Sequence, residues 1–304
     1  MTLKDLHYFV EVAAEKSITR ASARLFIAQP ALSQCIHKLE RELGITLLTR
    51  SSGGVELTSE GKCFLEFAQT VLKERSVLDR QLQDVENAEN GEIRLGFTGT
   101  QATYVLPYIL PDFQEQHPNV VISLVEATSD EVEKKLLAHE VDIGILHLPV
   151  LHEGLEYFEI SRDEMVIIPR SNSRFQRYIY YKENCTKPYL QADFLRDEPL
   201  ILTLPTQRSR MVCDQLLANA GIVPKIRQTS RNLSTLDALA QVDFASTIMP
   251  EKQVSPELKK RGCYHISEEI AVPYSFVVAV AAGAYLPIAA RHMLEEFRRK
   301  QYTF

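Results

Sequence analysis

Hydrogen-bonding side chains lie at helical spacing on one face of the segment from Gln29 to Leu43. The apolar positions recur at spacings of four, three and four residues, so they share the opposite helix face: Leu32, Ile36, Leu39 and Leu43. The polar face carries amide, hydroxyl and basic groups: Gln29, Ser33, Gln34, His37, Lys38 and Arg41. Such groups can pair with base edges in a major groove and with phosphates. The pattern predicts a DNA-reading helix, and an ordinary packed helix is the alternative.

The residues before this helix could hold it in place. Ala21 and Ala23 are small, so another helix backbone can approach them closely. Ser17 is a natural N-cap for a helix that begins at Ile18, and Pro30 suits the first turn of the next helix. Together with an amphipathic helix over residues 3–14, this arrangement predicts a helix-turn-helix.

A β-hairpin is predicted directly after the helices. Gly44 suits the end of a helix. Two strand-like pieces, Leu47–Arg50 and Val55–Thr58, flank a turn of two serines and two glycines. The hairpin would be the wing of a winged helix-turn-helix over residues 1–58. Arg50 and Ser51 would then lie at the DNA backbone.

A long helix is predicted over residues 59–89. Its apolar residues follow alternating spacings of four and three, interrupted by Arg75: Phe64, Ala68, Val71, Leu78, Leu82 and Val85. This seam favours pairing with a second copy over a single exposed helix. Residues 1–62 hold 8 basic and 7 acidic side chains, a net charge of +1. One copy would therefore bind DNA weakly, and a dimer is expected.

The composition is that of a globular protein with two or three domains, at 304 residues, 45% hydrophobic and 24% charged. No apolar run is long enough to span a bilayer and no signal peptide is recognisable, so we expect a cytoplasmic protein without membrane contacts. The five cysteines are far apart, and no two histidines have H-x-x-x-H spacing. We therefore expect no disulfide, metal or cofactor. Without a nucleophile–base motif or phosphate loop, an enzyme is not expected.

From residue 90 onwards strands alternate with helices, which indicates parallel βαβ units. The expected strands are Ile93–Phe97, Val120–Val125, Val141–Leu146, Glu164–Pro169, Leu200–Leu202, Lys225–Thr229, Phe244–Met249 and Tyr274–Val280. Residues 171–187 are expected to be irregular. Two blocks of similar size predict two lobes with a cleft between them: lobe 1 over about 91–161 and 270–304, and lobe 2 over about 162–269.

Residues 17–61 resemble the LysR-type transcriptional regulators. The matching motifs are Ala28-Gln29-Pro30-Ala31-Leu32-Ser33, then Ile36-x-x-Leu39-Glu40-x-x-Leu43-Gly44, and Leu57-Thr58-x-x-Gly61. The length, the long helix and the two-lobed remainder are similar too, so the resemblance covers the whole chain. The chain departs from the family pattern at Ala28, where a serine could cap the helix; the loss would cost about 1 kcal/mol. Leu48 replaces a usual phenylalanine, and residues 242–245 replace a glycine-rich turn.

The resemblance implies roles for particular side chains and partners. Gln29, Pro30, Ser33 and Gln34 would face base edges, and Thr19, Lys38 and Arg50 would hold phosphates. Residues 90–304 would form an α/β effector domain similar to the type 2 periplasmic-binding-protein fold. The implied partners are double-stranded DNA at dyad-symmetric promoter sites, further copies of the chain as a dimer and then a tetramer, and RNA polymerase as a further candidate.

Candidate effector contacts lie where strands end and helices begin in this domain, because ligands of such folds bind there. They are Thr98, Thr100, Gln101, Thr128, His147, Thr203, Gln207, Arg208 and Met249. Hydroxyl groups and a guanidinium suit a small, anionic metabolite. Simple helix capping is the alternative for the threonines.

These features predict a ligand-responsive regulator of transcription. A redox-sensing LysR-type regulator that uses Cys185 or Cys213 is the alternative. A free-standing solute-binding protein would need a signal peptide and no helix-turn-helix, and the sequence has the reverse.

Overall fold

The structure, a computed structural model, describes residues 1–51, 54–86, 91–99, 103–183 and 185–302, with the backbone alone at residues 50, 51, 80, 83, 85 and 86. The chain divides into two compact units, Met1–Ala88 and Glu89–Phe304. Within the described ranges, no helix is both long enough and apolar enough to cross a membrane.

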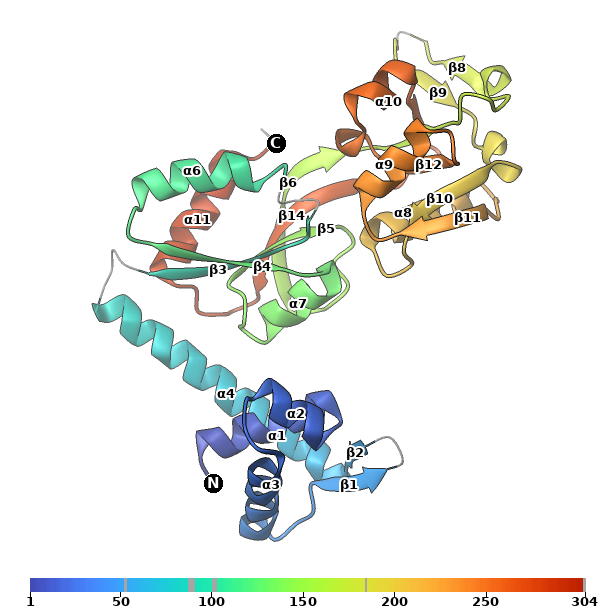
Figure 1. The fold of residues 1–304 in the computed structure, drawn as a ribbon. Helices are drawn as coiled ribbons and strands as arrows, with labels where there is room; N and C mark the ends of the chain where they lie inside the picture. Colours follow the sequence, from blue (N-terminus) through green and yellow to red (C-terminus); the bar gives the residue numbers. More distant parts are fainter. Residues whose placement is uncertain (52–53, 87–90, 100–102, 184, 303–304) are drawn as a thin grey trace. The chain divides into compact units, whose positions relative to one another are not determined.

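The N-terminal unit is a winged helix-turn-helix that continues into a long helix (Figure 1). Its elements are α1 Leu3–Glu15, α2 Ile18–Arg24, α3 Gln29–Leu43, β1 Leu48–Ser51, β2 Gly54–Leu57 and α4 Ser59–Glu86. The antiparallel β1–β2 hairpin is the predicted wing. Ser17 caps α2 by accepting from the amide of Arg20, and Gly44 ends α3 at a φ of 70°. Both features agree with the sequence prediction.

The core of this unit joins α1, α3 and α4. It includes Leu6 and Phe9 of α1, Leu32 and Ile36 of α3, and Phe64 and Ala68 of α4. The predicted apolar seam of α4 therefore has two parts with different environments. Its first residues are buried inside the unit, whereas Leu78 and Leu82 are 47% and 54% exposed. The second half of the seam is thus the part whose apolar side chains are exposed.

The C-terminal unit contains two lobes, each built on one sheet. In lobe 1 the strand order is β4-β3-β5-β14-β6; α6 and α11 cover one face and α7 covers the other (Figure 1). The bounds are β3 Glu92–Phe97, α6 Leu106–Gln116, β4 Val121–Glu126, α7 Ser129–Leu137, β5 Ile143–His147, β6 Leu155–Asp163, β14 Tyr274–Ala281 and α11 Ile288–Arg299.

Lobe 2 has the strand order β11-β10-β12-β7-β13-β9-β8. Helix α8 packs on one face of this sheet, and α9 and α10 pack on the other. The bounds are β7 Met165–Ile168, η1 Gln176–Tyr178, β8 Ile179–Tyr181, β9 Pro188–Leu190, η2 Ala192–Arg196, β10 Pro199–Thr203, α8 Arg208–Asn219, β11 Lys225–Ser230, α9 Leu233–Gln241, β12 Ser246–Pro250, η3 Glu251–Gln253, α10 Pro256–Arg261 and β13 Tyr264–His265.

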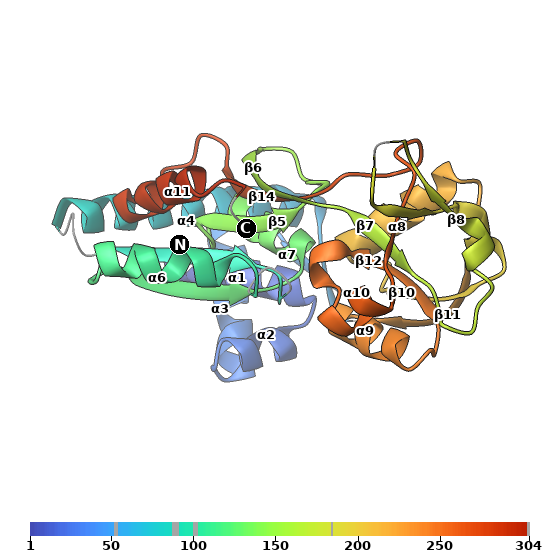
Figure 2. The same ribbon diagram turned by 90° about the horizontal axis from the view of Figure 1, so that it is seen from above.

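The segments that cross between the lobes differ from the prediction. One joins β6 to β7 and the other joins β13 to β14 (Figure 2). Strand β14 is antiparallel to β5 and β6, and β7 is antiparallel to β12 and β13. The expectation of parallel sheets holds for β3, β4 and β5 and for β10, β11 and β12. It is wrong for the crossing strands, because no helical crossover connects β6 to β7 or β13 to β14.

Four strands were missing from the prediction: β6, β8, β9 and the two-residue β13. Strand β6 begins earlier than the expected entry to lobe 2, and β8 and β9 form an antiparallel pair in and just after the segment that was expected to be irregular. Both β8 and β9 are only three residues long. Such short strands give too little alternation of polar and apolar residues to be recognised.

Candidate functional site

The polar face of α3 is accessible, as base reading requires. Gln29, Pro30, Gln34 and Lys38 are exposed and Ser33 is half-buried, while the opposite face is buried in the core. Thr19 on α2 is exposed as well. Ala28 is the N-cap of α3, and its side chain makes no capping hydrogen bond.

The motif residues that follow α3 hold the wing in place. Oε1 of Glu40 accepts hydrogen bonds from the amides of Leu47 and Leu48, at 2.8 and 3.2 Å. The hydroxyl of Thr58 accepts from the amide of Gly61 at 2.8 Å and so caps the start of α4. A Cβ on Gly61 would lie 2.1 Å from the carbonyl oxygen of Leu47, so a larger residue does not fit. These positions therefore build the DNA-binding unit and do not face its ligand.

The wing is tied to the turn before α2. The amide of Val55 donates to the carbonyl of Lys16 at 3.0 Å, and Gly54 lies so close that a Cβ would be 2.2 Å from the same oxygen. Arg50 and Ser51 lie in β1, where only the backbone is described. Their contacts with the DNA backbone stay a prediction.

Basic side chains near the reading helix have acidic neighbours. Lys38 Nζ lies 3.8 Å from Oε1 of Glu42, and Arg20 Nε lies 3.5 Å from Oε2 of Glu15. These are exposed pairs, which contribute about 0–1 kcal/mol each. Phosphates must compete with these carboxylates, which supports the expectation that one copy binds DNA weakly.

A cavity of about 670 Å³ lies between the two lobes of the C-terminal unit. Its volume is in the range of small-molecule sites. Lobe 1 contributes Thr98, Gly99, Thr103, Glu126, Ala127, Thr128, Ser129, Glu131, His147 and Tyr274, and lobe 2 contributes Thr206, Gln207, Arg208, Ser209, Arg231, Asn232, Leu233, Ser234 and Gln253.

Three helices begin at this cavity. The first residues of α7, α8 and α9, which are Ser129, Arg208 and Leu233, all line it. The N-terminus of a helix carries about half a positive charge and presents free amide groups. The guanidinium of Arg231 adds to this charge, that of Arg208 is paired with the carboxylate of Glu133, and the carboxylates of Glu126 and Glu131 oppose it. The arrangement favours an anion near the helix ends.

Four buried polar atoms in the cavity wall have no hydrogen-bond partner among the described residues. They are Nδ1 and Nε2 of His147, Nε of Arg208 and Nε2 of Gln253. Leaving such a group unpaired costs about 1–3 kcal/mol. Nitrogen atoms that protein groups leave unpaired in a cavity wall are available to a ligand.

His147 is held as a neutral ring. It stacks on Tyr274 with ring centroids 4.3 Å apart, and Phe276 lies opposite it on β14. Burial, and to a lesser degree the charge of Arg208, lower the pKa of His147 to about 3. A neutral imidazole has one donor and one acceptor nitrogen. This residue can therefore accept one hydrogen bond from a ligand and donate another.

One buried ion pair connects the two lobes across the cavity wall. Arg208 Nη2 of lobe 2 lies 2.6 Å from Oε1 of Glu133 in lobe 1, and both side chains are at most 4% exposed. The other oxygen of Glu133 accepts from the amides of Leu151 and His152, at 2.9 Å each. The carboxylate is thus fully bonded, and the pair fixes α8 against α7.

The predicted effector residues fall into three groups. Thr98, Thr128, His147, Gln207 and Arg208 line the cavity. Thr128 caps α7 through the amide of Glu131, Gln207 donates to the carbonyl of Arg231 at 2.7 Å, and Arg208 pairs with Glu133. Thr100 and Gln101 lie outside the described residues.

Two predictions are corrected by the structure. The hydroxyl of Thr203 is buried and bonded to Oγ of Ser209 at 2.8 Å, so it supports the turn before α8 and lies behind the cavity wall. Met249 is fully buried in the core under α9 and α10. Side chains alternate along a strand, and this one points into the core at the end of β12.

Sequence reasoning missed Tyr274 and Gln253. Tyr274 is the first residue of β14, directly after the crossing from lobe 2, and Gln253 lies in the short η3 turn. No local motif marks either position, since Tyr274 is brought to the cavity by a crossing between the lobes and Gln253 by a short turn within lobe 2. An unpaired side-chain nitrogen is a property of the folded structure and leaves no signal in the sequence.

Known protein families match both units. Residues 3–62 match the model of the bacterial regulatory helix-turn-helix protein, lysR family, and residues 86–301 match the LysR substrate binding domain. The uncharacterized HTH-type regulator YcgK of Bacillus subtilis (strain 168) is 28% identical over 97% of this chain and 93% of its own length. AlsR, an HTH-type transcriptional regulator of the same strain, is 32% identical over 82% of this chain and 80% of its own length.

A solved structure supports the same fold. Full-length CbnR, crystallised with its target DNA, has a TM-score of 0.60 and 24% sequence identity, and the match covers 99% of this chain and 100% of CbnR. The chain therefore belongs to the LysR family of transcriptional regulators, with a helix-turn-helix DNA-binding domain followed by the family's substrate-binding domain.

Proposed function

We propose that a small, anionic metabolite binds between the two lobes and controls DNA binding by this regulator. The observation that carries the proposal is the set of unpaired nitrogen atoms on His147, Arg208 and Gln253 in one cavity wall. A carboxylate would accept from Arg208 and Gln253, near the N-termini of α7, α8 and α9. A hydroxyl group on the same ligand would donate to the neutral imidazole of His147.

A thermal-shift screen of the full-length protein tests the ligand class. Small hydroxycarboxylates, their deoxy analogues and uncharged polyols form the three arms. We expect stabilisation by at least one hydroxycarboxylate, with His147→Phe removing most of the shift. Met249→Leu is the matched control, because that side chain is buried away from the cavity. The proposal is wrong if no carboxylate stabilises the protein, or if His147→Phe responds like the wild type.

For the DNA interface, we propose base contacts by Gln29, Pro30, Ser33 and Gln34 and backbone contacts by Thr19, Lys38, Arg50 and Ser51. The exposure of the α3 face supports this assignment. Replacing Gln29 and Ser33 by alanine should abolish a sequence-specific footprint, at about 1–3 kcal/mol for each lost base pairing. Arg41→Ala is the control, because its Nε already donates to the carbonyl of His37. An unchanged footprint in the double variant would show that α3 does not read the operator.

We further propose that two copies pair through the exposed half of the α4 seam and that dimers assemble into a tetramer in the cytoplasm. Closure of the cleft would change how dimers pair, and so the spacing or bend of bound sites. Replacing Leu78 and Leu82 by lysine should give monomers in sedimentation experiments. We propose no catalytic activity for the chain. RNA polymerase stays a candidate partner.

The redox alternative has less support. Cys213 is 1% exposed, and burial raises the pKa of its thiol, so the reactive thiolate is disfavoured. Cys185 is half-buried. If Cys185→Ser or Cys213→Ser removed a transcriptional response to an oxidant, this alternative would replace the metabolite proposal.

A further inference from the structure

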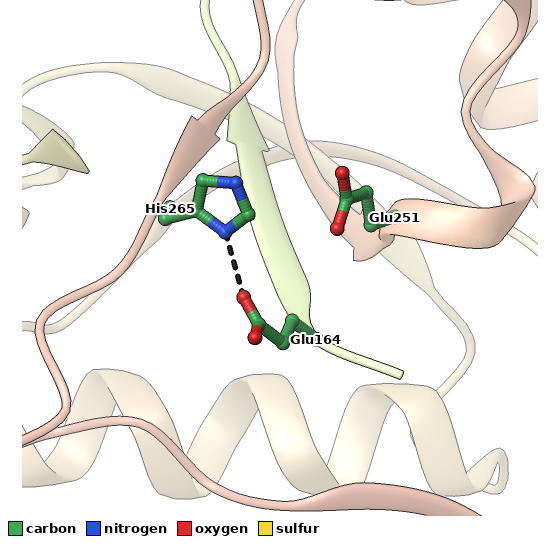
Figure 3. A group of neighbouring side chains, drawn as sticks. All are labelled: Glu164, Glu251 and His265. Atoms are coloured by element: carbon green, nitrogen blue, oxygen red, sulfur yellow. Dashed lines mark hydrogen bonds and ion pairs between the residues drawn. The ribbon is translucent and has the colours of Figure 1, made fainter. Parts of the chain in front are cut away.

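A histidine and two glutamates converge in lobe 2, next to one of the segments that cross between the lobes (Figure 3). Glu164 lies between β6 and β7, Glu251 begins η3 directly after β12, and His265 ends β13. One potential ligand atom from each residue lies within 4.8 Å of the other two. The cluster is separate from the residues proposed to bind the effector.

The register of the sheet explains why these side chains meet. Val166 of β7 is opposite Met249 of β12 and opposite His265 of β13. Two residues further along, the amide of Glu251 donates to the carbonyl of Glu164 at 2.8 Å, which continues the pairing beyond the strands. Opposite residues project to the same face, and so do residues two apart in a strand. The fold therefore directs all three side chains to one face.

The cluster brings two carboxylates together beside one imidazole. Two carboxylates from directly opposite positions repel each other. Nδ1 of His265 lies 2.7 Å from Oε2 of Glu164, and Lys187 Nζ lies 3.6 Å from the same oxygen. The His265 side chain is 6% exposed and fixed by strand pairing, while the Glu164 side chain is 60% exposed and can turn. One rigid ligand and two adjustable ones are thus in place.

We propose that Glu164, Glu251 and His265 bind a divalent transition-metal ion, and that Zn²⁺ suits them best. Imidazole nitrogen with carboxylate oxygen is a common donor set for Zn²⁺, and a water would complete four ligands. The imidazole makes Mg²⁺ and Ca²⁺ poor alternatives, because they prefer oxygen ligands. The ion would replace the proton shared by Nδ1 and Oε2. Ligand atoms of a tetrahedral site are about 3.3 Å apart, so the glutamates need to shift by about 1–1.5 Å.

A bound ion would act on the connection between the lobes. Glu164 is the single residue between the last residue of β6 in lobe 1 and the first of β7 in lobe 2. Its coordination together with Glu251 and His265 would fix this crossing segment to the ends of β12 and β13 in lobe 2. We therefore expect Zn²⁺ to stabilise the C-terminal unit whether or not an effector is bound.

Competition with a chromophoric chelator tests the site on metal-free, untagged full-length protein, with ZnCl₂ as the probe. We expect one tight equivalent of Zn²⁺ and an increase in the unfolding temperature. Glu164→Gln and Glu251→Gln should each weaken binding at least tenfold. Both positions accept substitution without disturbing the core, because their side chains are only partly buried. Lys187→Met should strengthen binding about two- to fivefold, since the ammonium group competes for Glu164.

A stacked pair of histidines in lobe 1, away from the cluster in lobe 2, provides the matched control. His117 and His292 have ring centroids 5.0 Å apart and are a plausible rival for Zn²⁺. His117→Gln should leave the tight equivalent unchanged. The proposal is overturned if no tight binding occurs, if His117→Gln removes it, or if both glutamate variants bind like the wild type. Co²⁺ in place of Zn²⁺ provides a further test, because the proposed site contains no cysteine. An absorption band from a thiolate ligand of Co²⁺ would also overturn the proposal.

Discussion

The reading helix and the cavity are both candidate binding surfaces, but they differ in how their polar groups are satisfied. Behind α3, the side chains of Glu40 and Thr58 hold the wing and the start of α4 through hydrogen bonds. In the cavity, nitrogen atoms of His147, Arg208 and Gln253 have no partner among the described residues. These groups of the DNA-binding unit are thus satisfied within the unit, whereas the cavity carries an energetic cost that a ligand can remove.

This difference predicts opposite responses to substitution. Changes to the motif residues of the N-terminal unit should lower its stability, because these residues hold its parts together. Changes to the unpaired groups of His147 and Gln253 should raise the stability of the ligand-free protein and lower its response to ligand. Arg208 is the exception, because another of its nitrogen atoms pairs with the buried Glu133. Such opposed effects are expected where a site is organised for binding at a cost in stability.

The largest effect is expected at the buried ion pair of Arg208 and Glu133, which connects the lobes through the cavity wall. Arg208→Met leaves the carboxylate of Glu133 buried and without its cation, at a cost of about 3–5 kcal/mol in the free energy of unfolding. Adding Glu133→Gln should restore more than half of the loss, because glutamine still accepts from the amides of Leu151 and His152. Urea denaturation of both variants measures this. Equal stability of Arg208→Met and the wild type would contradict a buried pair.

Gly61→Ala should give the next largest effect, in the N-terminal unit. Its Cβ would lie 2.1 Å from the carbonyl oxygen of Leu47, which is backbone and cannot move freely. We expect a loss of about 2–3 kcal/mol, typical of overpacking. Gly44→Ala is the control, because its φ of 70° is unfavourable for alanine but the space around it is open. It should cost about 1 kcal/mol. Thermal unfolding should rank the two in this order, and the reverse order would refute the close contact.

His147→Phe should stabilise the ligand-free C-terminal unit. The phenyl ring keeps the aromatic contacts with Tyr274 and removes two unpaired nitrogen atoms. We expect a gain of about 1–3 kcal/mol at pH 7. His147→Gln, which keeps polar atoms in the wall, should gain less. If both variants are less stable than the wild type, the ring is bonded in a way that the structure does not show.

The difference in the free energy of unfolding between His147→Phe and the wild type should also depend on pH. The pKa of His147 is about 3 in the folded chain, below the ordinary value of 6.5. Between these values the unfolded chain binds a proton that the folded chain does not. The free energy of unfolding of the wild type therefore falls as the pH falls, by about 1.4 kcal/mol per pH unit. His147→Phe lacks this contribution, so its advantage in urea denaturation should widen from pH 6.5 to pH 5.

Local sequence patterns determine how much of the fold could be predicted. The β1–β2 hairpin follows from two strand-like pieces around a glycine turn, and the start of α3 follows from Gln29 and Pro30. The antiparallel orientation of β14 in the sheet of lobe 1, and of β7 in the sheet of lobe 2, could not be predicted in this way. It depends on where the chain crosses between the lobes, and no short-range pattern records that choice.

The candidate sites differ in the same respect. The α3 face comes from one helix, so its spacing indicated which side chains are exposed. The cavity takes residues from many separate segments, and the rule that ligands lie at strand ends selected His147 and Arg208, which line it. The same rule failed for Met249, because the direction of a side chain at a strand end depends on register. The cluster of Glu164, Glu251 and His265 has no sequence signature, since its members are far apart in the chain.

The smallest effect is expected at Ala28, where the N-terminal unit departs from its family pattern. A serine at this N-cap would offer its hydroxyl to the amide of Ala31, which already donates to the backbone carbonyl of Ala28 at 3.0 Å. We therefore expect Ala28→Ser to add only about 0.5 kcal/mol, the low end for caps. Ser17→Ala, which removes an existing cap on α2, should cost about 1 kcal/mol. If Ala28→Ser strengthens operator binding without raising the unfolding temperature, the residue at this position serves a phosphate contact and not the helix. That outcome would make Ala28 a position at which the DNA-binding unit lacks a group meant for its ligand.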